Sequence, residues 1–374
     1  MLIFNLMATQ MNSFLKTTPL LLITVILISC SSEKQTKSTI ETDRPNIILL
    51  IGDGMGLSEL SAAFYYGDSL SNFARFNEIG LINTSSAKQK ITDSGAGGTA
   101  FSCGVKTYNG AVGVNSDSIS TQNIVEVLSE KNYNTGVVST SSVTHATPAC
   151  FYAHVVNRGM QNDIAQQLVE SEIDFFAGGG TSYFINRNDS VDLMKQLANE
   201  GFLINSDTDV ENLNSNNKYG FLLAEGGMPT MLDNRGDFLP KYTKLALDYF
   251  SKSEKPFFLM VEGSQIDWAG HENNTDYLIA ELLDFDSTVG IAMDFAERNE
   301  NTLVIVLADH ETGGFTLAAD GHDYYSIKPV FSTGGHSTTL VPVLAFGPGA
   351  QNFKGVYQNN DIFNKILGIV RQSN

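Results

Sequence analysis

The chain contains a stretch of small residues, Thr92 to Ala100 (TDSGAGGTA), in which a serine directly follows an aspartate. Ser94 stands where a helix can begin, and the Gly and Ala residues around it would let an oxyanion approach a bare hydroxyl. The simpler interpretation is an ordinary helix start, with Asp93 or Ser94 as N-cap and a first turn weakened by glycine. The choice between them depends on the rest of the chain.

Three further polar clusters each follow an apolar run that indicates a strand. They are Asp53 to Gly56 (DGMG), Asp267 to His271, and the pair Asp309 and His310. A carboxylate at the carboxyl end of a parallel strand is where α/β sheets build sites. A glycine-rich turn with a capping aspartate remains an equal alternative for the first cluster taken alone.

The residue types in these clusters are those of metal ligands. Asp267 and His271 are four apart and would share one face of a helical turn. Neutral imidazole and carboxylate suit Zn²⁺, whereas Glu262 and a hydroxyl suit Mg²⁺ better. A single histidine is more often an ordinary hydrogen-bonded residue, but the chain has only six, and His271, His310 and His336 all lie in Gly-rich or acid-rich contexts. This coincidence favours a metal centre around one hydroxyl.

Composition restricts the classes to which the chain can belong. Its 374 residues, 42% of them hydrophobic, allow one large α/β domain or two smaller ones. The formal net charge of -18 and the lack of a long Lys/Arg run argue against nucleic acid as a partner. An anionic substrate would therefore need positive charge supplied locally by metal ions or a few arginines.

Apolar runs and amphipathic stretches alternate from Pro45 onward. The run Asn46 to Ile51 (NIILLI) is typical of a strand buried on both faces of a sheet. The same pattern predicts strands at 135–139, 257–261, 302–307 and 341–346, and helices at 122–131, 163–171, 191–200, 241–252 and 277–297. This alternation predicts an α/β fold, a three-layer αβα sandwich with a large, mostly parallel central sheet. The least regular region, 205–235, is expected at the periphery.

The first 44 residues are expected to be a targeting segment and a tether. Lys16 precedes an apolar run that is too short to span a bilayer as a helix. Leu27 to Cys30 (LISC) resembles the bacterial lipoprotein box, so 1–29 would be a lipoprotein signal peptide, Cys30 would be lipidated, and 30–44 would be a flexible tether. The protein would then be exported and lipid-anchored in the cell envelope, facing the periplasm or the exterior. An ordinary cleaved signal with an incidental cysteine is the alternative, and a start at Met1 or Met11 stays open.

Two other cysteines, Cys103 and Cys150, lie among apolar or small residues. We expect buried thiols, and a disulfide between them stays open because spacing alone does not decide it.

Together these motifs resemble the bacterial alkaline phosphatases, specifically the shorter type found in cold-water bacteria. The resemblance covers about 46–363 and rests on segments in the family's order, namely DGMG, TDSGAGGTAFSCGVKTYNGAVGV, THATPA followed by AHVVNR, VEGSQIDWAGH, ADHETGG and GGHS. It implies a catalytic domain at 45–374 that hydrolyses phosphate monoesters to alcohol and inorganic phosphate through a phosphoserine intermediate. No deep hydrophobic specificity pocket is evident, so broad specificity is expected.

The resemblance also assigns roles residue by residue. Ser94 would be the nucleophile and Arg158 the phosphate clamp, and the cofactors would be two Zn²⁺ and one Mg²⁺. The implied ligand sets are Asp267, His271 and His336 for one zinc, Asp53, Asp309, His310 and, during catalysis, Ser94 for the other, and Asp53, Thr147 and Glu262 for magnesium.

Two positions near the phosphate and the third metal depart from the enteric members of the family, which have Asp and Lys there. This chain has His145 and Trp268. Trp268 cannot supply a cation to bound phosphate, and His145 could draw zinc to a position better suited to magnesium. The identity of the third metal is therefore left open.

Related enzyme classes and one non-enzymatic class are the alternatives to a phosphomonoesterase. Phosphodiesterases, phosphonate hydrolases, phosphomutases and sulfatases share the superfamily, but sulfatases need a Cys or Ser followed by x-Pro-x-Arg, which neither Ser94 nor Cys103 provides. A non-enzymatic lipoprotein that binds phosphate or metal is the alternative from a different class. As partners we expect small phosphomonoester substrates, no nucleic acid, the membrane through Cys30 and, by family resemblance, a second copy of the chain in a homodimer.

Overall fold

The computed structural model describes residues 44–205 and 213–372, and these belong to one compact unit. The predicted signal segment and most of the predicted tether lie outside the described residues. Within the described ranges, no helix has both the length and the apolar character needed to cross a membrane.

A ten-stranded sheet forms the centre of the described part of the chain, in the order β14-β2-β13-β8-β1-β7-β3-β4-β6-β5. Only β13 runs against its two neighbours, and every other pairing in this sheet is parallel. In chain order the strands are β1 Asn46–Gly52, β2 Glu78–Asn83, β3 Asn134–Ser142, β4 Phe175–Gly179, β5 Phe202–Ile204, β6 Lys218–Leu222, β7 Phe257–Gly263, β8 Thr302–Leu307, β13 Val341–Phe346 and β14 Gly355–Gln358.

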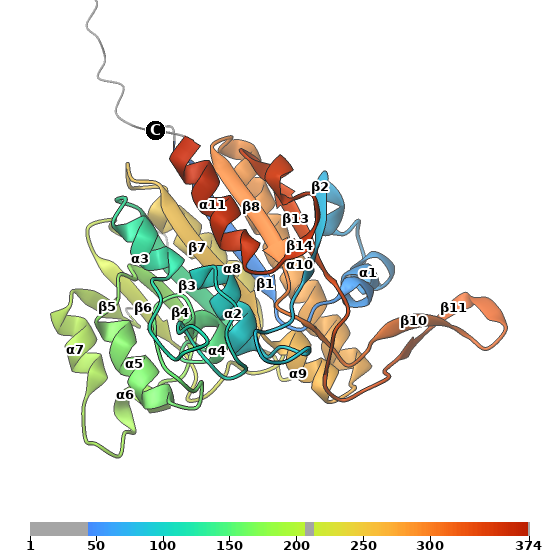
Figure 1. Cartoon of the computed structure of the whole chain (residues 1–374), viewed down its shortest axis with the longest axis horizontal. Coiled ribbons are helices and arrows are strands. Elements are labelled where there is room, and N and C mark those ends of the chain that lie inside the picture. The colour runs from blue at the N-terminus through green and yellow to red at the C-terminus, as the bar shows by residue number, and fades with distance from the viewer. Residues whose placement is uncertain (1–43, 206–212, 373–374) are drawn as a thin grey trace, which may run out of the picture. The chain divides into compact units, whose positions relative to one another are not determined.

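Helices cover both faces of this sheet, which confirms the predicted α/β sandwich (Figure 1). The group behind the sheet in Figure 1 packs around the longest helix and consists of α1 Leu57–Tyr66, α8 Phe238–Phe250, α9 Gln265–His271 and α10 Thr275–Arg298. The remaining helices are α2 Ser94–Cys103, α3 Ile124–Ser129, α4 Ala146–Ala149, α5 Gln161–Val169, α6 Ser182–Ile185, α7 Leu193–Asn199 and α11 Asp361–Gln372, with short 3₁₀ turns η1 Asn72–Arg75 and η3 Ala350–Phe353.

The central strands follow from their apolar runs. In β1 every residue after Asn46 is buried, and the whole of β7 and β8 is buried as well. Strands with no exposed face need parallel neighbours and helices on both sides, which is the arrangement observed. The predicted strands at 302–307 and 341–346 match β8 and β13 to the residue.

Several sequence predictions need correction. The helix expected at 122–131 is limited to Ile124–Ser129. Its later start follows from Asn123, which is the N-cap and forms a capping box with Glu126. The region expected to be least regular contains β6, which is the second strand from one edge of the sheet. This five-residue strand, whose last four residues are buried, was not predicted because the sequence around it is rich in Asn and Gly.

Cys103 and Cys150 are both buried and free, so there is no disulfide between them in the structure.

A small second sheet lies beside the carboxyl edge of the main one. It pairs β9 Glu311–Thr312 with β12 His336–Ser337 in antiparallel fashion. The chain between them forms a hairpin of β10 Thr316–Asp320 and β11 Asp323–Val330, which extends away from the rest of the described fold (Figure 1).

A buried triad of ionised side chains links Arg235, in the loop before α8, to Glu281 and Asp284 on α10. Arg235 Nη2 lies 2.5 Å from Glu281 Oε2 and 2.8 Å from Asp284 Oδ2, and all three side chains are almost fully buried. Removing the cation would leave two carboxylates without compensation in a dry site.

We therefore predict that Arg235→Met lowers the free energy of unfolding by about 3–5 kcal/mol. The matched control is Lys244→Met, which breaks the exposed pair Lys244 and Asp248 on α8 and should change stability little, because solvent screens that pair. Urea unfolding of both variants in the same metal-loaded state measures the difference. Equal effects of the two substitutions would contradict the argument.

Candidate active site

Ser94 is the first residue of α2, and Asp93 is its N-cap. The Asp93 carboxylate accepts a hydrogen bond from Ala96 N at 3.0 Å, so the capping interpretation is correct for Asp93. The Ser94 hydroxyl is therefore not the N-cap group. Every residue of α2 is buried. A Cβ on Gly97 would lie 3.0 Å from the Asp309 Cβ, so a residue without a side chain lets the helix approach this part of the site closely.

Three side chains meet in what we call the first metal group, Asp267, His271 and His336. The Nε2 atoms of the two histidines are 3.1 Å apart, and each lies 3.5 Å from Asp267 Oδ1. His271 Nδ1 lies 2.8 Å from the Gly334 carbonyl oxygen. His336 Nδ1 lies 2.8 Å from the Thr92 carbonyl oxygen. Because these carbonyls can only accept, the neutral rings carry their protons on Nδ1, and three lone-pair atoms converge on one point that fits a cation.

The second metal group consists of Asp53, Asp309 and His310, and the Ser94 hydroxyl lies next to it. His310 Nε2 is 3.5 Å from Asp53 Oδ1, 3.3 Å from Asp309 Oδ2 and 3.4 Å from Ser94 Oγ. His310 Nδ1 faces the Thr312 hydroxyl at 3.1 Å, which leaves Nε2 as an acceptor. The three ligands are completely buried, and this group too fits a cation.

The third metal group combines Asp53, Glu262 and His145, whose ligand atoms all lie within 4.8 Å of one another. Thr147 is also completely buried, and its hydroxyl has no hydrogen-bond partner among the described residues. The same holds for Glu262 Oε1 and both Asp53 oxygens. Glu262 Oε2 accepts from Ser139 Oγ at 2.5 Å. Buried oxygens without partners are costly, so this oxygen-rich set fits a hard cation.

Burial governs the electrostatics of these groups. It raises the pKa of Asp53 well above its ordinary value, and repulsion from Asp309 raises it further. Burial also raises the pKa of Glu262 and of Asp309. Conversely, burial lowers the pKa of His310 to about 3, which keeps the ring neutral and able to ligate. A divalent cation would offset the cost of ionising the carboxylates.

Arg158 lies at the same site. Its Nη1 donates to Asp93 Oδ2 and its Nη2 to His145 Nε2, each at 3.0 Å. Burial, and then the charge of Arg158, lower the pKa of His145 to about 3, so His145 is neutral. Burial alone would raise the pKa of Asp93, but hydrogen bonds from Ala96 and Gly110 and the Arg158 charge outweigh it and hold that pKa below its usual value. A guanidinium has five N–H donors, so three remain for a substrate.

Trp268 lies beside His145, with the two rings edge to face and their centroids 6.0 Å apart. A Cβ on Gly227 would lie 2.6 Å from Trp268 Cη2, so the glycine lets the loop at 226–228 pack against the indole. The structure thus brings the residues to which the resemblance assigns catalytic, phosphate-binding or metal-binding roles to one edge of the sheet, where β1, β3, β7 and β8 end.

Sequence reasoning missed Thr312, which joins two metal groups. Its hydroxyl donates to Asp267 Oδ1 at 2.5 Å and accepts from His310 Nδ1. Its backbone N–H donates to the Gly54 carbonyl, next to Asp53 in the chain. Gly54 has φ of +75°, and a Cβ there would lie 2.8 Å from Asp267 Cα. The available signal was the i, i+2 spacing from His310, which places both side chains on one side of an extended segment.

A buried serine hydroxyl, three groups of carboxylate and histidine side chains that fit cations, and an arginine lie together at the carboxyl edge of an α/β sheet, which is the arrangement of a metal-dependent phosphatase. The family model described as alkaline phosphatase matches residues 44–333. The chain belongs to the alkaline phosphatase family, and it hydrolyses phosphate monoesters in a metal-dependent reaction.

Particular relatives agree with this assignment. Alkaline phosphatase 3 of Bacillus subtilis is 37% identical over 80% of this chain and 68% of its own length, and the Escherichia coli enzyme is 31% identical over 86% and 85%. The solved alkaline phosphatase of the Antarctic bacterium TAB5 is 54% identical, covers 88% of this chain and 99% of its own, and superposes with a TM-score of 0.86. A variant of that enzyme, with one histidine replaced by aspartate, has Mg bound in its M3 site.

From the geometry of Thr312 we predict that Thr312→Val weakens metal binding roughly 10- to 100-fold, because it deprives the Asp267 carboxylate and the His310 imidazole of their shared partner. Thr312→Ser keeps the hydroxyl and should bind metal nearly as the parent does. Competition with a chelator, followed by metal analysis, measures both variants. If the valine variant retains metal as tightly as the serine variant, the hydroxyl has no such role.

Proposed function

We propose that this phosphatase works through a phosphoserine intermediate formed on Ser94, with two Zn²⁺, one Mg²⁺ and Arg158 as the phosphate clamp. The observation that carries the proposal is the place of Ser94 Oγ, 3.4 Å from His310 Nε2 at the start of a buried helix. The first two metal groups offer imidazole and carboxylate, as zinc prefers, and the third is rich in oxygen ligands.

The reaction then follows from the side chains. Ser94 Oγ attacks phosphorus, a new O–P bond forms, and the bond to the alcohol oxygen breaks so that the alcohol leaves with a proton. Water next attacks the phosphoserine, which releases inorganic phosphate and restores the serine. Two N–H groups of Arg158 hold two phosphoryl oxygens throughout and orient them for in-line attack. The metal ions, when bound, lower the pKa of the attacking oxygen and stabilise charge on the departing one.

We predict that Ser94→Ala lowers kcat by roughly a thousandfold or more and abolishes phosphoseryl formation, because no neighbouring group replaces the hydroxyl. Ser102→Ala, the same substitution in the same buried helix, is the control and should keep turnover near that of the parent. Quenched-flow trapping of labelled phosphoenzyme measures the intermediate directly. Substantial turnover by a folded Ser94→Ala variant would disprove the mechanism.

The third metal group and the phosphate site are where we propose departures from enteric relatives. Trp268 offers an apolar face and one donor in place of a cation, so product phosphate is held weakly. His145 belongs to the group with Asp53 and Glu262. Once Arg158 donates to phosphate instead of to the His145 ring, this ring can offer a nitrogen ligand, which favours zinc over magnesium. In the Antarctic enzyme, the variant with one histidine replaced by aspartate has Mg bound in its M3 site, which supports the view that a histidine-to-aspartate change can suit a third site in this family to magnesium.

Accordingly, we predict that His145→Asp raises the magnesium retained per chain after dialysis, and that Trp268→Lys lowers both KM and the inhibition constant for inorganic phosphate. The lysine variant should also turn over more slowly wherever phosphate release limits kcat. Metal analysis and product-inhibition assays measure the two effects. Unchanged or weakened phosphate inhibition in folded Trp268→Lys would show that the indole is only a packing residue.

We further propose that the enzyme is exported and held at the cell envelope by lipid on Cys30, since LISC matches a lipoprotein box. Membrane fractionation of a Cys30→Ala variant measures this anchoring.

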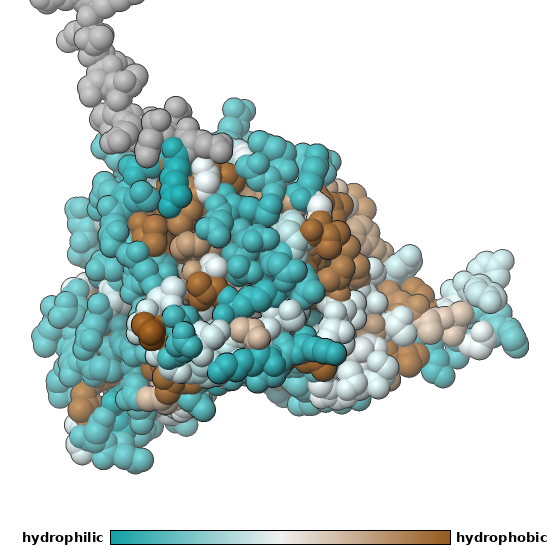
Figure 2. All heavy atoms as spheres, viewed as in Figure 1, coloured by the Kyte–Doolittle hydropathy of each residue, from teal (hydrophilic) through white to brown (hydrophobic). Residues whose placement is uncertain are grey.

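We also propose that the enzyme forms a homodimer through α1 and the β10–β11 hairpin. Figure 2 shows apolar surface on the side of the molecule where these elements lie. Phe64 and Tyr65 on α1 and Tyr324 and Tyr325 on the hairpin are exposed, and α1 contacts β10. A two-stranded hairpin is marginal without support, and a two-fold interface could provide it. Sedimentation measures the assembly.

A further inference from the structure

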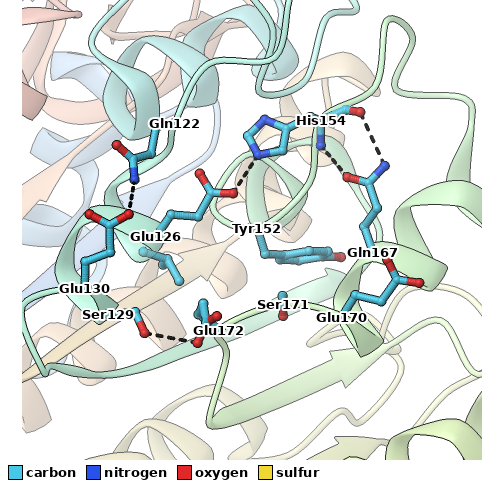
Figure 3. A pocket seen from close by; sticks show the side chains of 11 residues that line it. Gln122, Glu126, Ser129, Glu130, Tyr152, His154, Gln167, Glu170, Ser171 and Glu172 are labelled. Carbon is cyan, nitrogen blue, oxygen red and sulfur yellow. Dashed lines mark hydrogen bonds and ion pairs between the residues drawn. The ribbon is translucent and has the colours of Figure 1, made fainter.

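A cavity of about 770 Å³ opens between α3 and α5, away from the three metal groups. Figure 3 shows its polar lining, in which the His154 ring faces Glu126 on α3 and the His154 backbone faces Gln167 on α5. His154 belongs to the segment 153–158 that ends at Arg158. Neither the family assignment nor the proposed mechanism uses this histidine.

Both ring nitrogens of His154 face acceptors. Nδ1 lies 2.7 Å from the Gly113 carbonyl oxygen, and Nε2 lies 2.9 Å from Glu126 Oε1. A neutral imidazole has only one N–H, so only the doubly protonated ring can make both hydrogen bonds. The Glu126 carboxylate also accepts from the Asn123 backbone N–H in the capping box of α3, so α3 holds it in place.

The segment 153–158 is paired with 110–113, and this pairing carries Arg158 to the phosphate site. Val155 and Val112 exchange two backbone hydrogen bonds, and Arg158 N donates to the Gly110 carbonyl at 2.7 Å. Gly110 N in turn donates to Asp93, the same carboxylate that receives the Arg158 guanidinium. The His154 ring contacts Gly113, at the end of this pairing that lies away from Arg158.

Other charged groups around the cavity are engaged elsewhere. Glu130 accepts from Gln122, Glu170 accepts from Gln166, and Glu172 accepts from Ser129. Glu126 is thus the carboxylate that contacts the His154 ring, while Gln167 holds the backbone of His154 on the α5 side. The His154 side chain is 16% exposed, which gives protons a route to it.

We propose that His154 is a positioning residue that acts as a protonation-dependent latch on the Arg158 segment. The charged ring holds this segment to Gly113 and to Glu126 through hydrogen bonds. When the ring loses its proton, Arg158 binds phosphate less tightly. The inference rests on the proposed role of Arg158 as the phosphate clamp. The ligand concerned is a phosphoryl group, either in the substrate or as product phosphate.

The direction of the pH effect follows from the contacts. Burial opposes the charge on His154, but the hydrogen bonds to Glu126 and Gly113 outweigh it and raise the pKa of His154 above its ordinary value. The latch therefore stabilises the segment below the pKa of the unfolded chain, and this stabilisation is lost as pH rises through the higher folded value. Deprotonation turns the Nε2 lone pair toward a carboxylate and so repels it.

The test compares the inhibition constant of inorganic phosphate, KM and kcat across pH 7 to 9.5 (roughly half a unit to three units above an ordinary histidine pKa) in the metal-loaded enzyme. Glu126→Gln is the decisive variant, because its amide can donate to the neutral ring and also accept from Asn123, which makes the latch independent of pH. We expect the phosphate inhibition constant of the parent, divided by that of Glu126→Gln at the same pH, to rise roughly tenfold over this range. A tenfold change corresponds to the free energy of one charge-assisted hydrogen bond. KM should rise with it and kcat should not fall.

Glu170→Gln removes a cavity carboxylate that does not contact the ring and is the matched control, with the parent's pH profile expected. His154→Leu should show weak phosphate binding at all pH values. The chain has six histidines, and the NMR resonance that disappears in His154→Gln is that of the His154 imidazole. In the parent this resonance should titrate above the ordinary pKa of histidine.

Three outcomes would overturn the latch: identical pH profiles for the parent and Glu126→Gln, parent-like phosphate binding by folded His154→Leu, or a His154 resonance already neutral at pH 7. Arg158→Ala separates this failure from that of the clamp. If Arg158→Ala leaves phosphate inhibition unchanged, the proposed role of Arg158 is wrong. If Arg158→Ala weakens phosphate inhibition while the His154 variants do not, only the latch is wrong.

Discussion

Asp53, Glu262 and Asp309 are fully buried, and such carboxylates can stay ionised together only where positive charge is brought to them. The fold supplies little of that charge from its own side chains, since the guanidinium nearest to them is Arg158, which is already engaged with Asp93. Divalent cations are thus part of the electrostatic design of this sheet edge. A protein with a net charge of -18 can bind a phosphate dianion because the attraction is local.

The sheet determines where this charge balance is set. Parallel strands β1, β7 and β8 end level with one another, so Asp53, Glu262 and Asp309 arrive at the same edge from segments more than 40 residues apart in sequence. Their backbones are fixed by ladder hydrogen bonds and buried side chains, which keeps the ligand groups in register. The helix that bears Ser94 can then come close only because Gly97 has no side chain against Asp309.

Much of this could be predicted from the sequence, and the reason is physical. Buried parallel strands have continuous apolar sequences, so β1, β8 and β13 were located closely. The polar residues that follow such runs were chosen as site candidates, and the structure brings them together at one edge of the sheet. Thr312 and His154 were not found, because their roles depend on partners distant in the chain, such as Asp267 and Glu126. Strand β6 was missed since its Gly and Asn neighbours carry no apolar periodicity. The start of α3 was placed too early because Asn123 is the N-cap of this helix and not part of it.

The β10–β11 hairpin is inserted between β9 and β12, so its two ends lead to the second and the first metal groups. His310 immediately precedes β9, and His336 begins β12, where it pairs with Thr312. Any contact that orders the hairpin restrains these two imidazoles as well, and cations that fix the imidazoles restrain the base of the hairpin. Binding equilibria that share one structural element are reciprocally coupled. Metal uptake and binding of a partner by the hairpin are therefore linked thermodynamically, and each changes the affinity of the other by the same factor.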